Sequence, residues 1–242
     1  MGHIISAEGL SPDPEKIQAI LEMPDPENKQ ALQRVMGMVN YVGKFIPNLA
    51  TISTPIRQLL EKDVAWVWDD QHKACLSEIK KALTEAPVLK FYDPGKPVLV
   101  SVDASQHGMG ACLLQEGHPI AYASRSLNKA ERNYAQIEKE MLAIVFGTSK
   151  FHEYIYAKPN VNVETDHKPI ECLYKKPLGS APPRIQRMMT KIQNYDIQVK
   201  YKPGKELHIA DALSRAPQLC MENHVISLRY TRSVKNLSAM KS

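Results

Sequence analysis

Five short strand-like segments lie between residues 98 and 201, and their order limits the fold more than any other feature. The first is a β-branched run of the kind found in central strands. The next two follow after tight turns, which predicts an antiparallel meander. The five segments are residues 98–102, 108–114, 119–123, 161–165 and 197–201, with helices expected at 129–154, 170–174, 183–194 and 209–214. This order is typical of an α/β or α+β domain of about 120 residues.

The sequence before this domain is predicted to be mainly helical. Asp13 and Pro14 combine an N-cap residue with a proline at the first helical position. Apolar residues then recur at helical spacing, with further helices expected from about residue 28, at 54–60 and at 70–84. Turn-forming residues at 86–97 indicate a boundary. We therefore divide the chain into a helical segment at 1–86, a domain at 87–217 and a tail at 218–242 that we expect to lack regular structure.

Composition excludes several classes of protein. Hydrophobic residues make up 43% and charged residues 24%, which is not the composition of a disordered chain, a collagen or a coiled coil. No apolar run reaches the roughly 18 residues of a membrane span, and the N-terminus lacks a secretory pattern, so we expect no membrane partner. The four cysteines are far apart, which argues against a zinc site or a disulfide framework and favours a reducing compartment. The net charge of +5 is compatible with a nucleic-acid partner.

Four acidic residues fall at the ends of these predicted elements. Asp103 and Asp166 each follow a strand, and Asp211 lies in the first turn of the last helix. Glu140 is flanked on its helix by isoleucines three residues before and four residues after it, so we expect it to face the apolar side. Each acid alone has an ordinary explanation as an N-cap, a turn residue or a surface group. Four of them at the ends of elements of one sheet favour a divalent-metal site.

The chemistry of clustered carboxylates supports this interpretation. Carboxylates held together raise one another's pKa, and a divalent cation removes that cost. Mg²⁺ prefers hard oxygen ligands, and Mn²⁺ accepts the same ones. Two such ions about 3.5–4 Å apart can stabilise the attacking and leaving oxygens of a phosphodiester. The sequence therefore predicts metal-assisted phosphodiester hydrolysis with two Mg²⁺ ions as cofactor.

Four motifs resemble the ribonuclease H domain of gypsy-type LTR retrotransposon Pol polyproteins. They are residues 103–105 with 108–111, residues 131–145, residues 165–169, and residues 201–206 with 210–215. The catalytic Glu of that family precedes an apolar run, which selects Glu140 over Glu138. The resemblance implies a mixed five-stranded sheet whose second strand is antiparallel to its neighbours. It also implies that Asp103, Glu140, Asp166 and Asp211 are catalytic and hold the metal, in an endonuclease that cleaves the RNA strand of RNA–DNA hybrids.

The helical segment is similar to another part of the same polyproteins. Residues 2–14 resemble the end of a reverse transcriptase palm, and residues 37–48 resemble its thumb and connection, so the likeness covers about residues 1–217. The polymerase fingers, most of the palm and its Tyr-x-Asp-Asp motif are missing, so we expect no polymerase activity from this chain alone. The sequence departs from the family at Met188 and Leu207, where many relatives have Trp and Asn. His208 is the nearest match to a histidine that some ribonucleases H use in product release.

Basic residues near the end of the predicted domain form a candidate surface for an RNA–DNA hybrid. They are Arg184, Arg187, Lys191, Lys200, Lys202 and Lys205. Contacts to phosphates would explain them, and so would an ordinary solvated face. The remainder of a polyprotein is a second expected partner, and the resemblance implies an intracellular location, either in a cytoplasmic virus-like particle or in the nucleus.

Two other functions remain open from the sequence. The chain could be a non-catalytic module that binds nucleic acid or protein, derived from a domesticated or decayed retroelement. It could also be a polyprotein fragment with no independent role. The presence of all four acids favours the nuclease.

Overall fold

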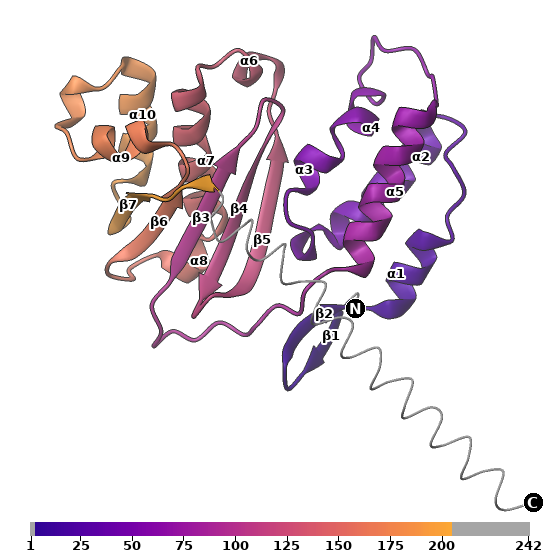
Figure 1. The fold of residues 1–242 in the computed structure, drawn as a ribbon, viewed down its shortest axis with the longest axis horizontal. Coiled ribbons are helices and arrows are strands. Elements are labelled where there is room, and N and C mark those ends of the chain that lie inside the picture. The colour runs from indigo at the N-terminus through magenta and orange to yellow at the C-terminus, as the bar shows by residue number, and fades with distance from the viewer. Residues whose placement is uncertain (1–2, 205–242) are drawn as a thin grey trace, which may run out of the picture.

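A mixed five-stranded sheet forms the centre of the computed structural model, which describes residues 3–204 (Figure 1). Its strands are β3 (Leu99–Ala104), β4 (Gly108–Gln115), β5 (His118–Ser126), β6 (Val161–Thr165) and β7 (Ile197–Tyr201). They lie in the order β5-β4-β3-β6-β7. Strand β4 is antiparallel to β3 and β5, whereas β6 is parallel to β3 and β7. This arrangement confirms the predicted ribonuclease H-like sheet.

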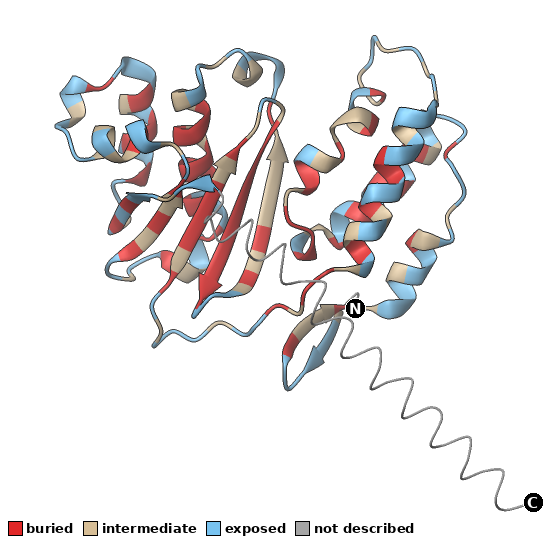
Figure 2. Cartoon of the chain, viewed as in Figure 1, coloured by how far each residue is buried: buried red, intermediate tan, exposed pale blue. Residues whose placement is uncertain are grey.

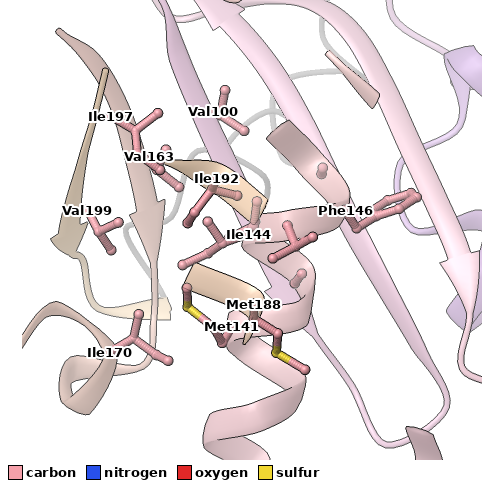
Figure 3. Packing of buried hydrophobic residues seen from close by; sticks show 14 of the residues in the cluster. Val100, Met141, Ile144, Phe146, Val163, Ile170, Met188, Ile192, Ile197 and Val199 are labelled. Atoms are coloured by element: carbon pink, nitrogen blue, oxygen red, sulfur yellow. The ribbon is translucent and has the colours of Figure 1, made fainter. Parts of the chain in front are cut away.

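One face of the sheet is covered by helices from the second part of the chain. Helix α7 (Gln136–Lys150) packs against β3 and β4, α10 (Pro183–Ile192) packs against α7, and α9 (Lys168–Tyr174) lies beside β7. A short 3-10 helix, η2 (Leu178–Ser180), precedes α10. Figure 3 shows Val100 and Val163 of the strands meeting Ile144 of α7 and Ile192 of α10. Alternate strand residues point to this face because successive side chains in a strand point to opposite sides.

The helical segment covers part of the other face of the same sheet. Its elements are α1 (Pro14–Leu21), α2 (Lys29–Tyr41), η1 (Gly43–Phe45), α3 (Leu49–Ile52), α4 (Thr54–Gln58) and α5 (Asp70–Thr84). Their core includes Cys112 and Leu114 of β4 and Tyr122 of β5. With helices on both faces, β4 is buried along its whole length (Figure 2). A two-stranded hairpin of β1 (His3–Ser6) and β2 (Gly9–Pro12) precedes α1.

The helix expected at 129–154 is wrong, because the chain bends twice within it. It forms α6 (Lys129–Arg132), α7 and α8 (His152–Ile155). Asn128 caps α6, and the extended backbone of Ala135 then starts α7, where the Ala135 N–H donates to Glu138 Oε2. Helix α3 has no counterpart in the sequence prediction. It begins after Asn48, whose φ of 52° lies in the left-handed region.

Among residues 3–204, no helix is both long enough and apolar enough to span a bilayer. The predicted helix at 209–214 and the tail at 218–242 lie outside the described residues. The division of the chain at residues 86 and 87, and the assignment of residues 1–86 to palm, thumb and connection, stay predictions.

Candidate metal centre

Three of the four predicted acids converge near the C-terminal ends of the neighbouring strands β3 and β6. Strands β3 and β6 are parallel neighbours, so Asp103 near the end of β3 and Asp166 directly after β6 lie at the same edge. Glu140 reaches them from α7, which packs across β3. One carboxylate oxygen from each of Asp103, Glu140 and Asp166 lies within 4.8 Å of the others. The fold therefore gathers side chains that are far apart in the sequence into a single acidic site.

Glu140 is buried at the centre of this site and is held by neutral hydrogen-bond donors. Its side chain is 2% exposed. Gln136 Nε2 donates to Glu140 Oε1 at 2.7 Å and to the Ala104 carbonyl at 3.0 Å, which ties α7 to the end of β3. Thr165 Oγ1 donates to Glu140 Oε2 at 3.4 Å. These contacts fix the position of the carboxylate without neutralising it.

The pKa values of Glu140 and Asp103 indicate that these two carboxylates have no positively charged partner among the described residues. Burial raises the pKa of Glu140 to about 8, and the charges of Asp103 and Asp166 act in the same direction, against the opposing hydrogen bonds from Gln136 and Thr165. Burial, and after it the charge of Asp166, also raises the pKa of Asp103. No basic side chain among the described residues contributes to the pKa of Glu140 or Asp103. Glu140 is buried, Asp103 is half-buried and Asp166 is exposed, and a group of carboxylates that opens to solvent on one side fits a divalent cation with a preference for oxygen ligands.

Gly204 leaves space beside Asp166. A Cβ atom at this position would lie 3.2 Å from Asp166 Oδ2, which is closer than an ordinary van der Waals contact. The Lys202 N–H donates to the Thr165 carbonyl at 3.0 Å and holds this part of the chain beside the end of β6. The sequence identified residues 201–206 only as a family motif, and the structure gives this glycine a physical role. The fourth predicted acid, Asp211, lies outside the described residues, as do Leu207 and His208.

The predicted basic residues have different surroundings in the structure. Arg184 donates to both carboxylate oxygens of Glu138, at 2.8 and 2.9 Å, and its guanidinium lies 4.2 Å from the centre of the Tyr134 ring. Arg187 and Lys191 are exposed on α10, and Lys200 is exposed on β7. Lys202 lies 3.6 Å from Glu164. Lys205 is outside the described residues, and the role of the group in binding nucleic acid stays a prediction.

Sequence reasoning missed the two residues that orient Glu140. Gln136 stands four residues before Glu140 on the same helix, a spacing that places the two side chains next to each other. Thr165 directly precedes Asp166, and its side chain is fully buried. The helical spacing of Gln136 was a usable signal, whereas the contact with Thr165 depends on how α7 packs against β6.

The reversed β4, the helix across β3 and the carboxylates at the ends of two parallel strands define a ribonuclease H-like domain. The family model of the RNase H-like domain found in reverse transcriptase matches residues 68–163.

Curated relatives place this domain in a larger kind of protein. The chain is 36% identical over 232 residues to the retrovirus-related Pol polyprotein from transposon opus of Drosophila melanogaster, a match that covers 90% of this chain and 23% of the relative. It is 34% identical over 221 residues to the Tf2-3 transposon polyprotein of Schizosaccharomyces pombe, which covers 89% of this chain and 17% of the relative. The chain thus spans less than a quarter of the length of either relative. It corresponds to one segment of the retrotransposon Pol polyproteins.

Solved structures agree with this placement at the level of the fold. The chain is similar to a foamy viral protease-reverse transcriptase in complex with an RNA/DNA hybrid, with a TM-score of 0.70 and 24% identity over 84% of this chain and 29% of that one. The dRH form of a foamy viral protease-reverse transcriptase in complex with double-stranded DNA gives a TM-score of 0.69 at 24% identity, over 84% of this chain and 37% of that one. The matched region is longer than the sheet and its covering helices together. The likeness therefore includes the helical segment as well.

Proposed function

We propose that the chain is a metal-dependent endonuclease that cleaves the RNA strand of RNA–DNA hybrids, as the ribonuclease H part of a retrotransposon reverse transcriptase. The observation that carries this proposal is the convergence of one carboxylate oxygen each from Asp103, Glu140 and Asp166 within 4.8 Å, where burial raises the pKa values of Asp103 and Glu140. The solved relative in complex with an RNA/DNA hybrid supports the substrate class.

The residues of the site fit divalent metal ions. Asp103, Glu140 and Asp166 would hold them, with Asp211 as the predicted fourth ligand. When bound, such ions lower the pKa of an attacking water and stabilise negative charge on the leaving 3′ oxygen. All the side-chain donors are carboxylate oxygens, which suits Mg²⁺ or Mn²⁺ and disfavours metals that prefer sulfur or nitrogen.

The protein's own contribution is to preorganise this carboxylate group. Gln136 and Thr165 hold the two oxygens of Glu140 in fixed directions, so little reorganisation is needed when a cation binds. The link from Gln136 to the Ala104 carbonyl keeps α7 in register with the strand that carries Asp103. Recognition of the hybrid would rest on its shape and on 2′-hydroxyl contacts across the minor groove.

Cleavage of a labelled RNA–DNA hybrid in the presence of Mg²⁺ tests the proposal. We expect cleavage of the RNA strand by the full chain and at least a 100-fold loss in Asp103→Asn, with the thermal unfolding temperature retained. Asp70→Asn removes an acid that is fully exposed on α5 and should cleave like the wild type. Retained cleavage in Asp103→Asn would contradict the proposal. Hybrid binding without any Mg²⁺-dependent hydrolysis would instead identify a non-catalytic binding module.

A further inference from the structure

A cavity of about 310 Å³ lies where the helical segment meets the outer edge of the sheet. Strand β5 is the last strand of the sheet on this side, and η1 and α3 both pack against it. The cavity is lined by Ala121–Ser124 of β5, by η1 and α4, and by the C-terminal end of α7. It shares no lining residue with the metal centre.

Three basic side chains from distant parts of the sequence line this cavity. They are Lys44 of η1, Arg57 of α4 and Lys150 at the end of α7. None of the described residues that line the cavity is acidic, and none of the ion pairs among residues 3–204 includes these three side chains. The cavity therefore carries positive charge without a protein counter-charge.

Arg57 is held in place by neutral partners rather than by an acid. Its Nε donates to Ser53 Oγ at 2.7 Å, and its Nη2 donates to Asn40 Oδ1 at 2.6 Å. Its other N–H groups remain available at the cavity. Burial lowers the pKa of Arg57, and also that of Lys44, so both charged groups would gain from an anion.

Ser124 adds a neutral donor to the same cavity. Its Oγ accepts a hydrogen bond from the Ala50 N–H at 3.1 Å, which leaves the hydroxyl proton free to donate. A guanidinium, two flexible ammonium groups and a hydroxyl are the donors that typically bind a phosphate group. The cavity volume exceeds that of a phosphate alone, which suits a phosphate that is part of a larger molecule.

We propose that the cavity lined by Lys44, Arg57 and Lys150 is a phosphate-binding site. The phosphate can come from the backbone of a duplex or from a free phosphate compound, and both sources present the same tetrahedral anion to the cavity. The site does not depend on the proposed nuclease activity, because it is separate from the carboxylates.

The test compares the wild type with Lys44→Gln/Lys150→Gln, all in EDTA so that the metal centre plays no part. Both lysines are exposed, and burial at the cavity desolvates Lys44 only in part, so these changes should not disturb the fold. The control is Lys16→Gln/Lys62→Gln, which removes the same charge from two exposed lysines outside the cavity. Two quantities are measured for each: affinity for hybrid and for duplex DNA over a range of salt, and thermal unfolding in inorganic phosphate or in chloride at equal ionic strength.

A backbone phosphate predicts that Lys44→Gln/Lys150→Gln binds both duplexes about tenfold more weakly than the control variant. The slope of log affinity against log salt should also fall by about one for each phosphate that the protein no longer neutralises. A free phosphate compound predicts unchanged duplex binding, with a rise in the unfolding temperature in phosphate for the wild type and the control but not for Lys44→Gln/Lys150→Gln. If the two double variants behave alike in both measurements, the proposed site is wrong.

Discussion

The side-chain oxygen of Asn48 lies in the space into which a Cβ atom at Gly110 would project. Gly110 is in the middle of β4 and is the cross-strand partner of Asp103. The helical segment thus contacts the sheet next to one of the metal-centre acids. Thr51 Oγ1 and Ser105 Oγ share a hydrogen bond at 3.3 Å, and Ser105 lies in the turn between β3 and β4.

Replacing Gly110 with alanine should weaken the packing of the helical segment against the sheet. The new methyl group cannot share its space with the Asn48 side-chain oxygen, so the Asn48 side chain must turn away, or α3 or β4 must shift. We expect the free energy of unfolding to fall by about 1–3 kcal/mol, as in other overpacked sites, measured by urea denaturation. Gly37→Ala is the matched control, because Gly37 is exposed in α2 with open space around it, and alanine there should stabilise the protein by about 0.5–1 kcal/mol. Equal stability of Gly110→Ala and the wild type would show that the contact is dispensable.

Glu140 and Glu138 should differ sharply in their effect on hydrolysis. Glu140→Gln keeps the shape of the side chain but removes its charge from the metal centre, so we expect at least a 100-fold loss of Mg²⁺-dependent cleavage. Glu138→Gln weakens the pair with Arg184 and the bond to the Ala135 N–H, which are both outside the carboxylate group. It should keep cleavage within about threefold of the wild type and lose about 1 kcal/mol of stability. The reverse order of activities would reassign the catalytic glutamate.

Gln136 should act on the metal centre through Glu140. Gln136→Leu removes the donor to Glu140 Oε1, and loss of such an outer hydrogen bond typically reduces metal affinity or activity 10- to 100-fold. We expect the Mg²⁺ concentration for half-maximal cleavage to rise, and activity to recover partly at high Mg²⁺. Gln33→Leu, at an exposed position of α2, should leave the Mg²⁺ dependence unchanged. A loss of activity that Mg²⁺ does not relieve would indicate that Gln136 only maintains the fold.

The raised pKa of Glu140 predicts how the stability of the metal-free protein changes with pH. The unfolded chain loses this proton near the ordinary pKa of 4.5, whereas the folded protein keeps it until about pH 8. The folded state therefore binds more protons in this window, and its stability falls as the pH rises. Each unit of pKa difference is worth about 1.4 kcal/mol. In EDTA, the wild type should lose stability relative to Glu140→Gln between pH 5 and pH 8, and Mg²⁺ should restore much of that loss. If the free energy of unfolding changes equally with pH in the two proteins, burial does not raise the pKa of Glu140.

Local signals in the sequence predicted most of the fold. The cap at Asp13, the helix at 70–84 and the strands at 161–165 and 197–201 agree with the structure because side chains close in sequence determine them. The breaks at residues 133–135 and 151 were not predicted, because the apolar pattern continues across them. Helix α3 has four residues, which is too short for a periodic pattern, and it is held by its contacts with β4 and β5.

Asp103 and Asp166 could be selected from the sequence because they follow predicted strands, and Glu140 because isoleucines flank it on its predicted helix. Their surroundings could not be predicted in the same way. Arg184 appeared suited to phosphate contacts, yet the packing of α10 against α7 brings it to Glu138. The cavity beside β5 combines residues 44, 57 and 150, and only the folded chain places these three together.

Strand β4 contributes to two hydrophobic cores at once, since Met109, Ala111 and Leu113 face α7 while Cys112 and Leu114 face the helical segment. A fragment that began at residue 87 would keep the acids but would expose the apolar side chains of β4 and β5 that the helical segment covers. We expect such a fragment to aggregate rather than remain monomeric. A shortened chain would therefore keep this architecture only if it retains the helical segment together with the sheet.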